Sequence, residues 1–203
     1  MLQFLNPEYL LATFGPLFFV LACAMIFAET GLLIGFFLPG DSLLFALGLF
    51  IGRGDIQVPL WLACLALSVF AFIGDQTGYW IGRISGPAVF NRPNSKLFNQ
   101  KNVDAAHAFF ERYGSRAVIL AHFVPIMRTF IPVAAGVAKL EWPKYAFYNV
   151  IGVVSWATGI TLLGSWLGNF AIVRQNLELA LVLFVVLSFI PIGIEILKAR
   201  KKR

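Results

Sequence analysis

Long runs of apolar residues without a charge alternate with polar stretches along this chain. Three of them, at residues 9–28, 56–74 and 145–173, match or exceed the roughly 20 residues that a helix needs to cross a bilayer. A fourth run, at residues 179–194, is shorter and would span by including its flanks. The pattern therefore predicts four membrane-spanning helices.

Two further apolar stretches, at residues 30–52 and 117–138, are interrupted near their middle. The interrupting residues are Pro39, Gly40 and Asp41 in the first stretch, and Pro125, Arg128 and Pro132 in the second. Proline removes a backbone donor and clashes with the preceding turn, so neither stretch suits one straight helix. Each half has about 8–11 residues, enough for about half the hydrocarbon thickness. We predict two re-entrant hairpins, broken at Pro39, Gly40, Pro125 and Pro132. The alternative at each place is a kinked spanning helix.

The basic residues give these elements one orientation. With the N-terminus in the cytoplasm, Arg53 and Arg174 lie outside and Arg128 lies within the membrane, while the other Lys and Arg residues face the cytoplasm. Membrane proteins show such an excess of basic residues in their cytoplasmic loops. We therefore expect a multi-pass protein with both termini in the cytoplasm.

An internal repeat recurs at a shift of 86 residues. Residues 37–39 (FLP) resemble residues 123–125 (FVP), and residues 78–82 (GYWIG) resemble residues 164–168 (GSWLG). Each copy would contain a hairpin followed by a spanning helix, and one crossing between the copies would make them enter from opposite faces. Inverted repeats of this kind are typical of secondary transporters. The predicted fold class is therefore an all-α membrane protein with an inverted-topology repeat.

Composition excludes a water-soluble protein. Hydrophobic residues make up 59% of the 203 residues and charged residues 13%, against about 45–50% and 25% in soluble domains. Most of the net charge of +6 comes from a basic tail at residues 198–203, so it does not indicate a nucleic-acid partner. We expect one integral membrane domain, residues 1–203, with an amphipathic interfacial segment at residues 86–113.

The chain offers little of the chemistry that enzymes or cofactor-binding proteins use. Cys23 and Cys64 each lie in an apolar run, where they suit core packing rather than a disulfide or a metal site. There are two histidines, and no motif places a nucleophile beside a base. We expect no enzymatic activity, no metal and no cofactor.

Ionisable residues in or beside the apolar runs are the candidates for function. They are Glu29, Asp41, Asp75 and Arg128, and a charge within a membrane costs at least ~2.5–3.5 kcal/mol. The carboxylates can take up and release protons, and the planar guanidinium of Arg128 suits a phosphate. If the hairpin tips meet at the midplane, Asp41 and Arg128 come together there. The alternative is that this pair only forms a structural salt bridge.

Three motifs follow one another in the order found in a known family. They are Glu29-Thr30-Gly31 with Phe37-Leu38-Pro39-Gly40-Asp41, then Gly74-Asp75 with Gly78-Tyr79 and Gly82-Arg83, then Phe123, Pro125, Arg128, Thr129, Pro132 and Ala135-Gly136. With Asn149, Gly152 and Trp156, they make residues 29–168 resemble the DedA family, whose core is the VTT or SNARE-associated-like domain. The resemblance implies paired re-entrant hairpins in the bacterial inner membrane. For many members it implies transport of phospholipid carriers, notably undecaprenyl phosphate, with functional roles for the residues that match Glu29, Asp41 and Arg128.

These observations together give a predicted site. The groups for proton or cation coupling are Glu29, Asp41 and Asp75, and the groups for phosphate are Arg128, His122 and Arg83. His122 stands where the family usually has a second arginine, so its positive charge would depend on pH. We expect a transporter or flippase for a phospholipid carrier, with membrane lipids and protons or cations as partners and a homo-oligomer as a possible assembly. Three alternatives stay open: a proton-coupled transporter of small solutes or ions, a general phospholipid scramblase, and a purely structural role.

The orientation predicts which side of the membrane two sites face. In a chain with Cys23 and Cys64 replaced by serine, Ser95→Cys should react with an impermeant thiol reagent only from the cytoplasm, and Arg53→Cys only from outside. Labelling of the two cysteines in spheroplasts and in inverted vesicles measures this. Access to Ser95→Cys from outside would contradict the topology.

Overall fold

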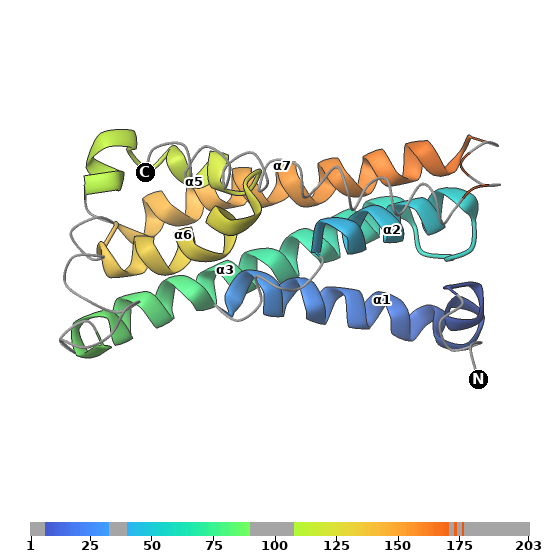
Figure 1. Cartoon of the computed structure of the whole chain (residues 1–203), viewed down its shortest axis with the longest axis horizontal. Helices are drawn as coiled ribbons and strands as arrows, with labels where there is room; N and C mark the ends of the chain where they lie inside the picture. Colours follow the sequence, from blue (N-terminus) through green and yellow to red (C-terminus); the bar gives the residue numbers. More distant parts are fainter. Residues whose placement is uncertain (1–6, 33–39, 90–107, 171–172, 174–175, 177–203) are drawn as a thin grey trace, which may run out of the picture. The chain divides into compact units, whose positions relative to one another are not determined.

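The computed structural model describes residues 7–32, 40–89, 108–170, 173 and 176, and this part of the chain is helical with no strand. The all-α fold class is therefore confirmed. The helices are α1 (Pro7–Gly31), α2 (Gly40–Arg53), α3 (Leu60–Val89), α5 (Ala117–Ala121), α6 (Pro125–Val137) and α7 (Trp142–Gly168) (Figure 1). The predicted fourth span at residues 179–194, the tail at residues 198–203 and most of the interfacial segment lie outside the described residues.

Two of the described helices are long and apolar enough to cross a membrane: α3 over Leu60–Ser85 and α7 over its whole length. Both begin next to a proline: Pro59 directly precedes α3, and Pro143 is the second residue of α7, where a missing N–H costs nothing. Large apolar side chains on them are exposed, among them Trp61, Phe147 and Trp166. Such a surface is stable only where lipid or another protein covers it.

The helices break near the positions that the sequence predicts, with two differences. Helix α3 continues to Val89, well past the end of the predicted span at residue 74. α2 begins at Gly40, and α5 and α6 are separated by residues 122–124, so that α6 begins at Pro125. The prediction that Pro132 interrupts the second stretch is wrong, because Pro132 lies inside α6. Proline within a helix removes one hydrogen bond, a loss that a helix held by its neighbours tolerates. Pro39 lies outside the described residues, and the depth of both hairpins in the membrane stays a prediction.

The chain forms two compact units. The first consists of Met1–Met25, Pro39–Leu67 and Ala157–Arg203, and the second of Ile26–Leu38 and Ser68–Trp156. Asp41 belongs to the first unit, whereas Glu29, Asp75, His122 and Arg128 all belong to the second. Helices α1, α3 and α7 each contribute residues to both units.

In the first unit, α2 packs against the C-terminal part of α7 through glycines. A Cβ atom added at Gly48 would collide with the carbonyl oxygen of Thr161, and one at Gly52 would collide with that of Ser165. On the facing helix, Gly164 is equally close to the carbonyl oxygen of Phe45. The two backbones are therefore in direct contact, which only glycine permits.

In the second unit, α6 packs against α3 in a similar way. A Cβ atom at Gly136 would collide with the carbonyl oxygen of Tyr79, and one at Gly82 with that of Val133. Tyr79 and Ser165 are 86 residues apart, the shift of the internal repeat. Each unit thus uses the same position of its long helix for backbone contact with its short helix. The buried core beside this contact consists of Tyr79, Phe110, Val118, Ala121, Ile131, Ala135 and Tyr145.

This contact predicts that Gly136→Ala destabilises the protein. The new methyl group must displace backbone, and overpacking of this kind costs about 1–3 kcal/mol. Gly159→Ala is the matched control, because Gly159 lies within α7 with nothing within 4 Å of an added Cβ. Melting temperatures of both variants in the same detergent provide the measurement. A Gly136→Ala variant as stable as Gly159→Ala would show that the two helices are not in backbone contact.

Candidate functional site

Among the described residues of the second unit, four acidic or basic side chains are buried. Glu29 lies near the end of α1, Asp75 in α3, His122 between α5 and α6, and Arg128 in α6, and none is more than 3% exposed. A buried charge is stable only where other groups pair with it. The contacts of these four residues therefore define the candidate site.

Arg128 and Glu29 form a buried ion pair between α6 and α1. The guanidinium carbon of Arg128 also lies 4.1 Å from the centre of the Trp156 ring, which comes from α7. The face of an indole ring attracts a cation, and guanidinium groups stack well on it. Arg128 is thus held by a carboxylate and by an aromatic face, each from a different helix.

Glu29 is placed beside Arg128 by close contact of α1 with α3. The hydroxyl of Thr30 donates to the carbonyl oxygen of Ala71 at 3.2 Å. A Cβ atom at Gly31 would lie 2.9 Å from the carbonyl oxygen of Gly74, so the two glycines allow the helices to touch. The motif Glu29-Thr30-Gly31 therefore combines one residue of the candidate site with two packing residues.

Asp41 is the second residue of α2 and is half-buried in the first unit. The sequence predicts that it meets Arg128. Within the second unit, the carboxylate paired with Arg128 is that of Glu29. Contact between Asp41 and Arg128 stays a prediction, because the two residues belong to different units.

Asp75 and His122 form the second buried pair. The Nε2 atom of His122 lies 2.9 Å from Oδ2 of Asp75, and Nδ1 lies 2.8 Å from the carbonyl oxygen of Val118. A Cβ atom at Gly152 would collide with the imidazole ring, so the absent side chain makes room for it. Both ring nitrogens already have protein partners, which does not favour the phosphate-binding role predicted for His122.

Two amide side chains connect this pair to Trp142 at the start of α7. Asn149 Nδ2 donates to Oδ2 of Asp75 at 2.6 Å and lies 3.4 Å from Nε2 of His122. Gln76 Nε2 donates to Oδ1 of Asn149 at 2.9 Å, and the indole N–H of Trp142 donates to Oε1 of Gln76 at 3.0 Å. A continuous chain of hydrogen bonds therefore runs from the exposed Trp142 to the buried pair.

Arg83 lies apart from both buried pairs. Its Nη1 atom donates to the hydroxyl of Tyr79 at 2.9 Å and lies 3.4 Å from the carbonyl oxygen of Leu140. The Tyr79 hydroxyl donates to the same carbonyl at 2.6 Å. The Tyr79 ring stacks on the ring of Tyr145, with 4.6 Å between the ring centres. Arg83 is half-buried, and a guanidinium has five N–H donors, so it keeps donors for a phosphate.

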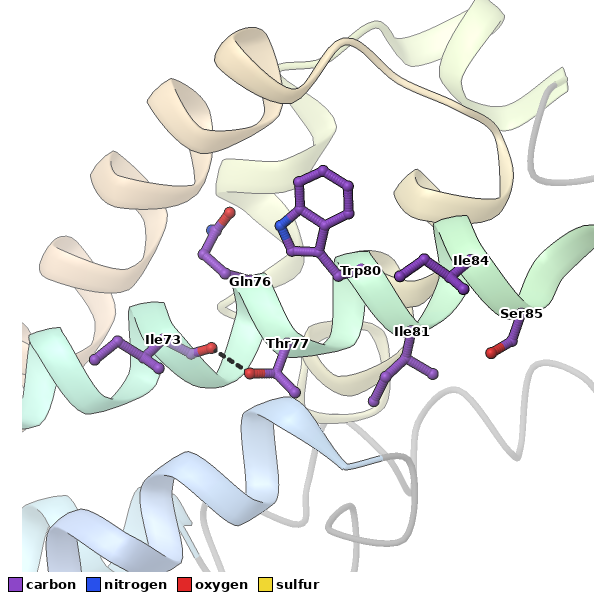
Figure 2. Close-up of a pocket in the computed structure, with 7 residues that line it drawn as sticks. All are labelled: Ile73, Gln76, Thr77, Trp80, Ile81, Ile84 and Ser85. Carbon is purple, nitrogen blue, oxygen red and sulfur yellow. Dashed lines mark hydrogen bonds between the residues drawn. The ribbon is translucent and has the colours of Figure 1, made fainter.

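A shallow hollow of about 430 Å³ lies along one side of α3. Its lining is mostly apolar and comes from Ile73, Gln76, Thr77, Trp80, Ile81, Ile84 and Ser85 (Figure 2). Figure 2 shows Gln76 and Trp80 projecting from the same side of the helix. The hollow thus lies next to the residue that continues the hydrogen-bond chain towards Asn149.

The sequence predicts Asn149 and Trp156 only as part of the family resemblance, without a role, and it makes no prediction for Gln76. A signal for the first two exists, because Tyr145, Asn149, Gly152 and Trp156 follow at spacings of four, three and four residues. This spacing places them on one face of α7. In the described part of the chain, no group of three or more His, Cys, Asp or Glu residues could hold a metal ion.

Comparison with known proteins identifies similar sequences. The family model of the VTT domain matches residues 38–166. Uncharacterized membrane protein ML0287 of Mycobacterium leprae (strain TN) is 45% identical over 167 residues, which cover 82% of this chain and 74% of that protein. Protein DedA of Escherichia coli (strain K12) is 37% identical over 192 residues, covering 95% and 88%. Inner membrane protein YqjA of the same strain is 31% identical over 166 residues, covering 81% and 71%. No solved structure matches.

The contacts of Tyr79 predict that Tyr79→Phe lowers stability by about 1–3 kcal/mol. The variant keeps the ring stack on Tyr145 but removes a buried hydroxyl that bonds to both Leu140 and Arg83. Tyr148→Phe is the matched control, because the Tyr148 hydroxyl makes no hydrogen bond in the described part of the chain. Thermal unfolding of the two variants in the same detergent checks this. Equal melting temperatures would contradict the importance of the hydroxyl.

Proposed function

We propose a transport function from one premise: the chain belongs to the DedA family of VTT-domain membrane proteins. ML0287 and YqjA are membrane proteins by name, and the family is generally linked to membrane transport. The proposed substrate is a phospholipid carrier, with undecaprenyl phosphate as the first candidate. The protein moves it across the bacterial inner membrane in a step coupled to protons or cations.

The observation that carries this proposal is the buried pair of Arg128 with Glu29. A guanidinium binds a phosphate through two parallel hydrogen bonds, and this one is already held against the ring of Trp156. A lipid phosphate that reaches Arg128 replaces the carboxylate of Glu29 as its partner. Glu29 then takes up a proton, since an unpaired carboxylate would be costly in this buried place. Exchange of the two anions thus couples phosphate binding to protonation.

Asp41 and Asp75 supply the further acidic groups of the proposed mechanism. Asp41 lies in the first turn of α2, directly after the predicted break of the first hairpin. Asp75 is fully buried and paired with His122. Arg83 binds the phosphate at an earlier or later stage, because its contacts lie away from Arg128. No catalytic residue or cofactor belongs to this mechanism, which moves protons but breaks no covalent bond of the substrate.

Apolar surface beside the site supports a lipid rather than a small polar solute. The hollow along α3 is open to the side and mostly apolar, which suits an acyl or isoprenoid chain (Figure 2). The proposed architecture has four spans and two re-entrant hairpins in an inverted repeat, with both termini in the cytoplasm. The starts of α2 and α6 and the matching glycine contacts in the two units support it.

Reconstitution of the whole chain into liposomes tests the proposal. Labelled undecaprenyl phosphate should move between leaflets faster with a proton gradient than without one. Equal movement of all phospholipids without a gradient would identify a scramblase instead. Uptake of a small solute, with no lipid movement, would favour the alternative of a small-solute transporter.

Arg128→Lys should weaken binding of the lipid phosphate about tenfold, which corresponds to about 1.4 kcal/mol. The ammonium group keeps the charge but loses the two parallel donors and the stacking on Trp156. Lys144→Gln is the control for loss of a cation, because Lys144 is exposed and pairs only on the surface with Glu141. Binding of labelled lipid phosphate to the purified variants gives the measurement.

Binding that is intact in Arg128→Lys, and also in the charge-swapped variant Glu29→Lys/Arg128→Glu, would contradict the proposal. The ion pair would then serve only to hold α1 and α6 together. The melting temperature of each variant separates loss of binding from loss of folding.

A further inference from the structure

The carbonyl oxygen of Val118 fixes which nitrogen of His122 carries a hydrogen. A backbone carbonyl only accepts hydrogen bonds, so Nδ1, at 2.8 Å from it, must be the donor. The other nitrogen, Nε2, is therefore the one whose protonation can change. It faces Oδ2 of Asp75 at 2.9 Å.

The hydrogen-bond chain from Trp142 fixes the amide groups beside this pair. An indole N–H is only a donor, so it bonds to the oxygen of Gln76, and the nitrogen of Gln76 then bonds to the oxygen of Asn149. The amide nitrogen of Asn149 consequently points towards Asp75 and His122, with its two hydrogens near Oδ2 and Nε2. The amide N–H groups of Asn149 can therefore donate to Asp75 Oδ2 and His122 Nε2 when no proton lies between these two atoms.

We infer that Asp75 and His122 bind one exchangeable proton between Oδ2 and Nε2. With the proton bound, the pair is a carboxylate with an imidazolium, or a carboxylic acid with an imidazole, and either form is neutral overall. Release of the proton to water breaks that one O–H or N–H bond and leaves a carboxylate, a neutral imidazole protonated at Nδ1, and the two donors of Asn149. The use of this proton in transport rests on the proposed function, whereas its binding does not.

The surroundings of the pair fit proton exchange better than a fixed salt bridge. Among the described residues, Asp75 Oδ1 is buried and has no hydrogen-bond partner, which disfavours a permanently ionised carboxylate. The other titratable group facing the pair is Tyr145 of α7, whose hydroxyl donates to the backbone carbonyl of Asp75 at 3.2 Å. On α1 and α6, the charged groups of this unit are Glu29 and Arg128, which pair with each other.

Nuclear magnetic resonance of the whole chain in lipid nanodiscs tests proton binding directly. The chain has two histidines, so ¹⁵N-labelled histidine in a His107→Gln background reports on His122 alone. The ¹³C-labelled carboxyl carbon of Asp75 is assigned by its loss in Asp75→Asn. Between about pH 5 and about pH 9 we expect Nδ1 to stay protonated, while Nε2 and the carboxyl carbon change together in a single step.

Three results would overturn the inference: no change at Nε2 in this range, titration at Nδ1 instead, or separate steps for the two residues. The measurement requires no transport. If the signals change as expected but the reconstituted chain moves no lipid phosphate, the proton site stands and the proposed function fails. If lipid phosphate moves while the signals stay constant, the inference fails alone.

The pH dependence of transport then tests the role of this proton. We expect the native rate to change several-fold between about pH 6 and about pH 8, and that of His122→Arg to change less than the native rate, because a guanidinium stays protonated and only the other acidic groups still exchange protons. His107→Gln, the matched histidine control, should keep the native profile. A merely structural role would lower the rates of His122→Arg and His122→Asn at every pH without changing the profile, and would overturn the coupling role.

Discussion

A charged side chain in hydrocarbon costs a few kcal/mol unless another group of the protein pairs with it. In the second unit this constraint draws five elements together, because each buried ionisable group finds its partner on a different element. Glu29 of α1 meets Arg128 of α6, which also rests on Trp156 of α7. Asp75 of α3 meets His122, which follows α5, and Asn149 of α7. The polar contacts of this unit therefore specify which elements are neighbours.

Side-chain pairs of this length require helix backbones that almost touch. The glycines meet this requirement, since Gly74 faces α1 and Gly136 faces the backbone of α3. Gly152 leaves the space that the imidazole of His122 occupies. Association of helices in lipid depends on close packing more than on the hydrophobic effect, so small residues are needed on contacting faces. These glycines thus bring the charged side chains within reach of one another and also allow the helices to pack together.

The sequence predicts the helical class and most helix boundaries because apolar runs and proline breaks are local signals. Pro132 is one exception: whether a helix continues through proline depends on what packs around it. The sequence also identifies Glu29, Asp75 and Arg128, since charges in apolar runs are conspicuous, whereas His122 is predicted only through the family resemblance. It does not predict that Arg128 pairs with Glu29, because sequence position alone does not say which residues of different helices meet. The sequence does not predict the role of Gln76 for a related reason. A neutral amide is not conspicuous in the sequence, and its role depends on its hydrogen bonds with Trp142 and Asn149.

The contact between Gly152 and His122 restricts how this protein can change over generations. The imidazole ring fills the volume that a side chain at position 152 would occupy, so the two positions share one space. Any residue larger than glycine at position 152 first requires a smaller or differently directed side chain at position 122. That change in turn removes one of the two side-chain partners of Asp75. Substitutions at these two positions are therefore acceptable only in a particular order. Fewer mutational paths are open to the protein than the number of tolerated sequences alone implies.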